Sequence, residues 1–306
     1  ATPFDLDVVL GDMSLALPTT GVGTLLLPAG ASPERPVPAM IVVHGSGGIA
    51  PGREMEYARL LNANGYAALV IDYYLPRGAT ADVSYMIRVL SITEFDAISD
   101  AYHALALLQT HPDLDASRIG IMGFSYGGMA ARFAMDQRIA ESLHASGPRF
   151  AVHVDYYGPC FQKLPAVAVT GAPLLTLRGT EDKSNDLEAC ALREQELRAL
   201  GARVESLVYA GAGHAWEIAR ERRLSEESPY VVGCEVSYDE RGRSMSGAEY
   251  IVDIPLDTPR AERISVRLAS SDVLRDCVQS GYVIGRDDAT RAQSDAALLE
   301  FLAREL

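Results

Sequence analysis

The stretch Gly123-Phe124-Ser125-Tyr126-Gly127 places a serine hydroxyl between two glycines at the end of an apolar run. Residues 119–122 are typical of a buried strand, and residues 129–134 are typical of a helix. A sharp strand-to-helix turn strains its corner residue, needs the flanking glycines, and exposes the serine oxygen at the carboxyl edge of a sheet. A glycine-rich turn with a solvent-facing serine would show the same residue pattern. We interpret the spacing as a nucleophile elbow, with Ser125 as an acyl-transfer nucleophile.

A serine nucleophile needs an adjacent base and a group that orients this base. After a nucleophile elbow these arrive in the order serine, acid, histidine. The histidines downstream of Ser125 are His144, His153 and His214. His144 lies in an expected surface stretch, and His153 lies in the middle of an expected strand. His214 lies in the glycine-rich loop GAGHAW after a strand, so it is the predicted base.

The orienting acid is expected in the loop GTEDKSND, which follows the strand-like stretch APLLTLRG. Asp182 is the favoured residue, and its neighbours Glu181 and Asp186 are candidates either for this role or for the cap of the following helix. Asp155, at the end of the preceding expected strand, is the alternative outside this loop. The acid would fix the tautomer of His214 and stabilise the imidazolium that forms.

An oxyanion needs backbone donors aimed at it, and one is expected from the N–H of Tyr126, the residue after the nucleophile. The second donor is expected from the loop HGSGG at residues 44–48. Either Ser46 or Gly47 could supply it, and the sequence leaves this choice open. We interpret His44 as a residue that shapes this loop.

Aromatic and basic residues near the expected strand ends could line a substrate pocket or could simply pack between loops and sheet. They are Tyr73, Tyr74, Arg77, Tyr126, Tyr156 and Tyr157. Trp216 is the preferred pocket wall, because it follows His214 by two residues in a loop that must approach the serine.

Short apolar stretches alternate with longer amphipathic ones along most of the chain. Expected strands lie in 39–48, 66–74, 119–122, 150–158, 172–179 and 202–209, and expected helices span 54–64, 92–110, 184–200 and 287–306. Two alternating runs, 6–10 and 22–27, predict an antiparallel start to the sheet. The alternation predicts an α/β fold with a mostly parallel central sheet and helices on both faces.

Residues 225–285 break this alternation and contain a hairpin-like stretch, CEVSYDERGRSM. We interpret them as an insertion before the last helix within a single domain, 1–306. A lid, a dimer contact and a structural brace all remain open as its role.

The composition disfavours two classes of partner. The formal net charge is −14, from 41 acidic and 27 basic residues, which opposes binding to nucleic acid and to anionic membrane surfaces. No apolar run approaches the ~18 residues of a membrane span. No C-x-x-C spacing is present, so no structural zinc site is expected. The oligomeric state is not predicted.

Five motifs span roughly residues 38–217: VVHGSGG, VIDYYLPRG, DASRIGIMGFSYGG, APLLTLRGTED and VYAGAGHAWE. In these motifs the chain resembles the dienelactone hydrolase family of α/β-hydrolases. This resemblance implies the α/β-hydrolase fold and a hydrolase. The acyl-transfer chemistry expected of Ser125, His214 and the acid implies no metal or organic cofactor. Two departures matter: the founding members use a cysteine nucleophile where this chain has Ser125, and in compact members the last helix follows soon after the histidine loop.

The same resemblance informs the cysteines. Cys160 follows a strand at the active edge of the sheet, and Cys190 lies early in the helix after the acid loop, while Cys234 and Cys277 bracket the insertion. Among the three possible pairings, we predict Cys160–Cys190 and Cys234–Cys277. Such bridges predict a secreted or periplasmic protein.

Taken together, these features predict a serine carboxylic ester hydrolase that uses a Ser125–His214–Asp182 triad. The expected substrates are small esters with short to medium acyl, aryl or lactone groups. The alternatives are a serine peptidase of the same fold and a binding module that has lost its chemistry. A peptidase would usually carry a propeller or a helical cap, and a binding module would lack a triad residue.

Overall fold

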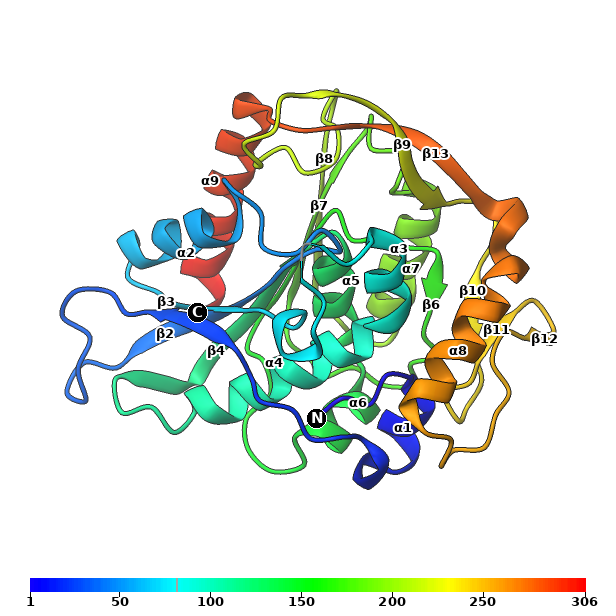
Figure 1. Ribbon diagram of the computed structural model, residues 1–306. Coiled ribbons are helices and arrows are strands. Elements are labelled where there is room, and N and C mark those ends of the chain that lie inside the picture. The colour runs from blue at the N-terminus through cyan, green and yellow to red at the C-terminus, as the bar shows by residue number, and fades with distance from the viewer. Residues whose placement is uncertain (81) are drawn as a thin grey trace.

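The fold is built around a twisted sheet that crosses the centre of the molecule in the computed structural model, which describes residues 1–80 and 82–306 (Figure 1). Among these residues, seven strands form the sheet in the order β1-β3-β2-β4-β5-β7-β8. Strand β1 is antiparallel to β3, and the other neighbours are parallel. The strands are β1 (Gly23–Leu26), β2 (Val37–Val43), β3 (Ala67–Ile71), β4 (Leu114–Phe124), β5 (His153–Tyr156), β7 (Leu174–Gly179) and β8 (Val204–Tyr209).

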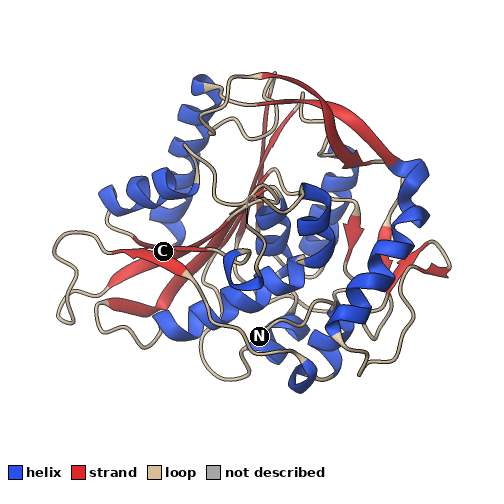
Figure 2. Cartoon of the chain, in the orientation of Figure 1, coloured by secondary structure: helices blue, strands red, loops and turns tan. Residues whose placement is uncertain are grey.

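Helices cover both faces of this sheet, as Figure 2 shows. One face packs against α2 (Glu54–Ala63) and α9 (Asp288–Glu305), and the other packs against α4 (Glu94–Leu108), α5 (Tyr126–Phe133) and α6 (Gln137–Leu143). Strand β2 divides its side chains between the two layers: Met40 and Val42 face one, Ile41 and Val43 the other. Because both faces are buried, the strand is apolar throughout rather than alternating. The predicted α/β-hydrolase architecture is confirmed.

Two helix starts lie two or three residues after the predicted ones because side chains cap these helices. Thr93 and Asp96 form a capping box, so α4 begins at Glu94. Asp186 accepts from the N–H groups of Glu188 and Ala189, so α7 (Leu187–Ala199) begins after it. Asp186 is therefore the cap residue of the acid loop. The short helices η1 (Met13–Leu15), η2 (Leu75–Arg77) and α3 (Tyr85–Ser91) precede α4 in the chain.

The prediction of a strand over residues 6–10 is wrong, because these residues form helix α1 (Leu6–Gly11). Leu6, Val9 and Leu10 contact the core beside α6, and their spacing is that of one helix face. The second predicted run is confirmed as β1, which pairs antiparallel with β3.

The segment between β8 and α9 holds two further sheets. Strands β9 (Arg223–Val231) and β13 (Val278–Ile284) form an antiparallel ribbon that arches over one side of the central sheet (Figure 1). Strands β10 (Val236–Tyr238), β11 (Ser244–Ser246) and β12 (Glu249–Tyr250) form a small sheet with β6 (Gln162–Lys163). Pairing of β10 with β11 confirms the predicted hairpin. Helix α8 (Arg260–Ser270) and η3 (Ser271–Cys277) were not predicted.

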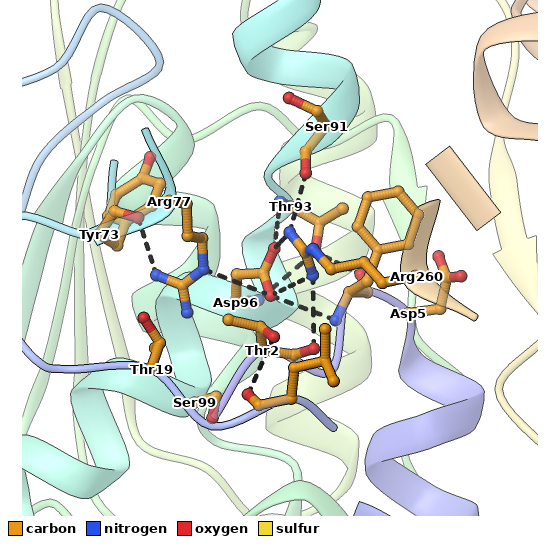
Figure 3. A network of polar contacts seen from close by, with 12 residues as sticks. Thr2, Asp5, Thr19, Tyr73, Arg77, Ser91, Thr93, Asp96, Ser99 and Arg260 are labelled. Carbon is orange, nitrogen blue, oxygen red and sulfur yellow. Dashed lines mark hydrogen bonds and ion pairs between the residues drawn. The ribbon is translucent and has the colours of Figure 1, made fainter. Parts of the chain in front are cut away.

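Helix α8 is attached by charge rather than by an apolar stripe, which is why apolar spacing does not reveal it. Arg260 reaches Asp96 with two contacts of 2.8 and 3.0 Å, and Arg263 lies 3.0 Å from Asp7. The buried Asp96 carboxylate also accepts from the backbone N–H of Phe4. Figure 3 shows Arg77 and Arg260 converging on this carboxylate from opposite sides. Asp96 thus joins the N-terminal segment, α4 and α8.

The cysteines pair as predicted. Cys160 is bonded to Cys190 with Cα atoms 5.0 Å apart, and Cys234 to Cys277 with Cα atoms 5.7 Å apart. Two such bridges are consistent with an oxidising compartment. Within residues 1–80 and 82–306, none of the helices has the length and hydropathy required to cross a lipid bilayer.

Candidate active site

Ser125 lies at the corner between β4 and α5, in a backbone conformation with φ of 54° and ψ of −118°. The turn is tight enough to require its glycines. A Cβ atom on Gly123 would lie 2.0 Å from the carbonyl oxygen of Gly127, and one on Gly127 would lie 2.4 Å from that of Val43. The strained serine is held by its N–H, which donates to the Tyr156 carbonyl at 2.8 Å. These contacts explain the G-x-S-x-G spacing.

Ser125, His214 and Asp182 meet at this corner. His214 Nε2 lies 2.9 Å from Ser125 Oγ, and His214 Nδ1 lies 2.6 Å from Asp182 Oδ2. His214 and Asp182 are buried, whereas Ser125 is partly exposed. With Nδ1 protonated toward Asp182, Nε2 can accept the serine proton, so the arrangement can activate the hydroxyl as a nucleophile.

The acid loop carries two supporting residues that the sequence analysis did not single out. Ser184 donates from its N–H and its hydroxyl to Asp182 Oδ1, at 3.0 and 2.5 Å. Asn185 Nδ2 donates to Asp182 Oδ2 at 2.9 Å. Asn185 also accepts from Arg178 at 2.7 Å, and its Oδ1 lies 3.8 Å from the disulfide sulfur of Cys190. The only sequence signal for these residues is their place beside Asp182.

The alternative residues have other partners. Asp155 is buried in ion pairs with Arg132 and Arg178, at 2.6 and 3.0 Å. His153 is buried against the Ala131 carbonyl, and burial lowers its pKa to about 4. The structure therefore brings only His214 of the three downstream histidines to Ser125, because His144 bonds to Gln109 instead.

The loop of residues 44–48 lies directly against the serine. A Cβ atom on Gly45 would lie 3.2 Å from Ser125 Cβ. Three tyrosines contact this loop. Tyr73 donates to the His44 carbonyl at 3.3 Å, Tyr74 donates to the Ser46 carbonyl at 3.1 Å, and the Tyr85 hydroxyl lies 3.1 Å from Ser46 Oγ.

His44 is buried and stacks on the Tyr73 ring at 3.9 Å. Tyr126 directly follows the serine and is the first residue of α5, so its N–H has no acceptor within the helix. The backbone donors expected from Tyr126 and from Ser46 or Gly47 thus lie in segments that adjoin Ser125.

The expectation that Trp216 lines a pocket is wrong. Its ring is fully buried between the sheet and α9, where Nε1 donates to Ser294 Oγ at 3.0 Å. Ala215, with a φ of 51°, turns the backbone between His214 and Trp216.

The side chains of Arg77, Tyr73 and Tyr74 are also buried in the scaffold. Arg77 pairs with Asp100 at 2.6 Å, and the two tyrosines contact the 44–48 loop. They pack between loop and sheet rather than against open space.

Tyr157 contacts the histidine itself, with the two rings 4.5 Å apart, edge to face. Its hydroxyl bonds to Glu217, a buried carboxyl that sequence analysis missed. Burial raises the pKa of Glu217 to about 8, although Arg53 lies 4.0 Å away.

Tyr282, on the distant strand β13, was also missed, and its ring lies 5.4 Å from the His214 ring. Nothing in the sequence sets the register of β13 against the histidine loop. In the part of the chain that the structure describes, no group of three acidic, histidine or cysteine side chains is arranged to hold a metal ion.

Comparison with known proteins identifies the family. The dienelactone hydrolase family model matches residues 24–243. An Escherichia coli (strain K12) protein named "Putative carboxymethylenebutenolidase" is 28% identical over 197 residues, which are 60% of this chain and 69% of that protein. A Bradyrhizobium sp protein named "Probable 2-oxo-3-(5-oxofuran-2-ylidene)propanoate lactonase" is 27% identical over 197 residues, which are 59% of this chain and 73% of that protein.

A solved structure, that of Thermogutta terrifontis esterase 2 phosphorylated by paraoxon, shares the fold. Its TM-score is 0.52 at 17% identity, over 66% of this chain and 86% of that chain. With the family match covering well over half of its length, the chain belongs to the dienelactone hydrolase family of α/β-hydrolases and is a hydrolase.

Proposed function

We propose that this hydrolase is a serine carboxylic ester hydrolase that works through an acyl-enzyme, on small esters with short to medium acyl, aryl or lactone groups. The observation that carries the proposal is the chain of contacts from Ser125 Oγ to His214 Nε2, at 2.9 Å, and from His214 Nδ1 to Asp182 Oδ2, at 2.6 Å. The lactonase name of the Bradyrhizobium relative supports cyclic esters as one substrate class.

In the first step, Ser125 Oγ attacks the ester carbonyl while His214 Nε2 takes its proton. Asp182 holds His214 in the required tautomer and stabilises the imidazolium without taking the proton itself. The tetrahedral oxyanion accepts from the Tyr126 N–H and from a backbone N–H of Ser46 or Gly47. Losing one such donor typically costs ~2.7–4 kcal/mol of transition-state stabilisation.

In the second step, the imidazolium of His214 donates its proton to the departing alcohol, and the acyl group remains on Ser125. Water then attacks the acyl-enzyme with His214 again acting as the base, which releases the acid and restores the hydroxyl. The residues named supply every proton transfer, so the proposal requires no metal or organic cofactor.

The direct test is hydrolysis of p-nitrophenyl esters from acetate to palmitate. Wild type should hydrolyse the short esters, and Ser125→Ala should lose about 10⁴-fold or more in kcat. Ser14→Ala, which changes an exposed serine in the same way, is the matched control and should keep wild-type rates. Full activity in Ser125→Ala would refute the proposed nucleophile, and inert wild type would refute ester hydrolysis.

We also propose that the protein is secreted or periplasmic and that residues 225–285 are an insertion within its single domain. The disulfide pairs Cys160–Cys190 and Cys234–Cys277 support the compartment. Thiol titration of the protein purified from its native source, under denaturing conditions, should detect no free thiol. Four free thiols would contradict the proposed compartment.

A further inference from the structure

The ribbon of β9 and β13 is fixed to the histidine loop by backbone contacts. The His214 N–H donates to the Val283 carbonyl at 2.7 Å, and the Gly285 N–H donates to the His214 carbonyl at 3.0 Å. The approach is so close that a Cβ atom on Gly213 would lie 2.6 Å from the Val283 carbonyl oxygen. The ribbon is therefore part of the wall around His214.

A break in strand pairing turns Tyr282 toward the histidine. The register of β13 against β9 shifts between Ser280 and Tyr282, and the intervening Gly281 has a φ of 96°. Such bulges re-aim side chains and occur often beside active sites. The Tyr282 ring lies edge to face with His214 at 5.4 Å and packs on Tyr230 at 6.1 Å. It stays only partly buried.

Tyr85, on helix α3, lies on the side of the serine where the 44–48 loop runs. Its hydroxyl contacts Ser46 Oγ at 3.1 Å, and the residue is 39% exposed.

Tyr85 thus contacts the 44–48 loop and Tyr282 contacts His214, and these are two segments that adjoin Ser125. In the ester hydrolysis proposed above, the oxyanion turns toward the 44–48 loop and the alcohol departs toward His214, which protonates it. The alcohol part of the ester is therefore expected on the side of Ser125 where His214 and its neighbour Tyr282 lie. A planar ring there could pack against the tyrosine edge to face, which a saturated ring of similar size cannot do as well.

We propose that Tyr282 and Tyr85 form an aromatic clamp that selects esters of aryl-bearing alcohols. This inference rests on the proposed ester hydrolysis at Ser125 and names the group that the site recognises. Tyr282 supplies the main wall against the alcohol, and Tyr85 supplies the second wall beside the oxyanion loop.

The test compares benzyl acetate with cyclohexylmethyl acetate. The two esters share the acyl group and the chain length, and their alcohols are similarly poor leaving groups. The ratio of kcat/KM for the benzyl ester to kcat/KM for the cyclohexylmethyl ester therefore measures the preference for an aromatic ring. Wild type should favour the benzyl ester. Tyr282→Leu should lower this ratio about 2- to 12-fold, as expected for the loss of an aromatic pair. Tyr282→Phe keeps the ring and should keep the ratio.

Tyr250→Leu is the matched control, because Tyr250 is an exposed tyrosine on β12. Tyr85→Leu is a second test on a different element, and it decides the matter if Tyr282→Leu does not fold. A wild-type ratio near one, or an unchanged ratio in the leucine variants, would overturn the clamp while leaving ester hydrolysis intact. Wild type that hydrolyses no ester at all would overturn the proposed function as well.

Discussion

Asp182 is surrounded by groups that all donate to it. Ser184 donates twice to Oδ1, and Asn185 and His214 approach Oδ2 at 2.9 and 2.6 Å. A carboxylate can accept all these bonds, whereas an amide would turn a donor toward one of the donors. The position therefore depends on charge and on acceptor geometry together.

Asp182→Asn should lower kcat for p-nitrophenyl acetate by about 10⁴-fold, because the amide would favour the wrong tautomer of His214. KM should change little, since Asp182 is buried behind the histidine. Asp186→Asn is the matched control in the same loop, because asparagine caps a helix about as well as aspartate. Steady-state kinetics of both variants would decide, and a loss of less than tenfold in Asp182→Asn would contradict the assigned role.

The three residues that meet at the elbow could be predicted because each is marked by a local motif next to a strand end. Ser125 is marked by its glycines, His214 by its glycine-rich loop, and Asp182 by its place after β7. Trp216 could not be placed, because the turn at Ala215 determines which side of the loop its ring faces. Sequence spacing does not report such a turn.

At the scale of elements, apolar strands were predictable and elements held by charge were not. Strand β2 reads as a continuous apolar run because both of its faces are buried. Helix α8 presents Arg260, Arg263 and Arg267 toward acidic partners instead, the last lying 4.0 Å from Glu94. These partners come from the N-terminal segment and α4, so no local sequence pattern predicts the helix.

The two disulfides should contribute similarly to stability but differently to activity. They link residues 30 and 43 positions apart, and because loop entropy grows only logarithmically, each should stabilise the fold by roughly 4 kcal/mol. Cys160–Cys190 lies beside Asn185, which holds Asp182, whereas Cys234–Cys277 joins the base of the ribbon. Loss of the Cys160–Cys190 disulfide should therefore disturb the position of Asp182 in the acid loop.

Paired alanine substitutions would separate these effects. Cys160→Ala with Cys190→Ala should lower both the free energy of unfolding and kcat for p-nitrophenyl acetate. Cys234→Ala with Cys277→Ala should lower the free energy of unfolding by a similar amount and largely keep kcat. Urea unfolding and steady-state kinetics measure the two quantities, and equal losses of kcat in both variants would argue against the distinction.

For the molecule as a whole, remote charges hold distant parts of the chain together. Arg260 and Asp96, which are 164 positions apart, form one of these links. With a net charge of −14, the protein also buries acidic groups at a cost that depends on pH. Burial raises the pKa of Asp5 to about 6 and that of Glu217 to about 8. These ion pairs and buried carboxyls form only when distant segments meet in the folded protein, so no local sequence pattern predicts them.

Glu217 should make the protein less stable as the pH rises. Its ordinary pKa is 4.5, so above this pH the unfolded chain releases the proton that the folded protein retains up to about pH 8. The folded state then binds more protons, and the free energy of unfolding falls by up to about 1.4 kcal/mol per pH unit. The contribution is complete below pH 4.5 and is lost as the pH passes through about 8. Asp5, whose pKa is about 6, is largely ionised in both the folded and the unfolded protein above that pH. Above about pH 6, the change in stability therefore reports Glu217 and not Asp5.

Glu217→Gln should remove this slope. Between about pH 6.5 and 8, wild type should lose about 1 to 2 kcal/mol more than the variant, as measured by urea unfolding at each pH. The difference between the two proteins cancels the other titrating groups, which both retain. Glu240→Gln, at an exposed glutamate, is the matched control and should follow wild type. Parallel pH profiles for wild type and Glu217→Gln would mean that the buried carboxyl is already ionised in the folded protein, with Arg53 as its counter-ion.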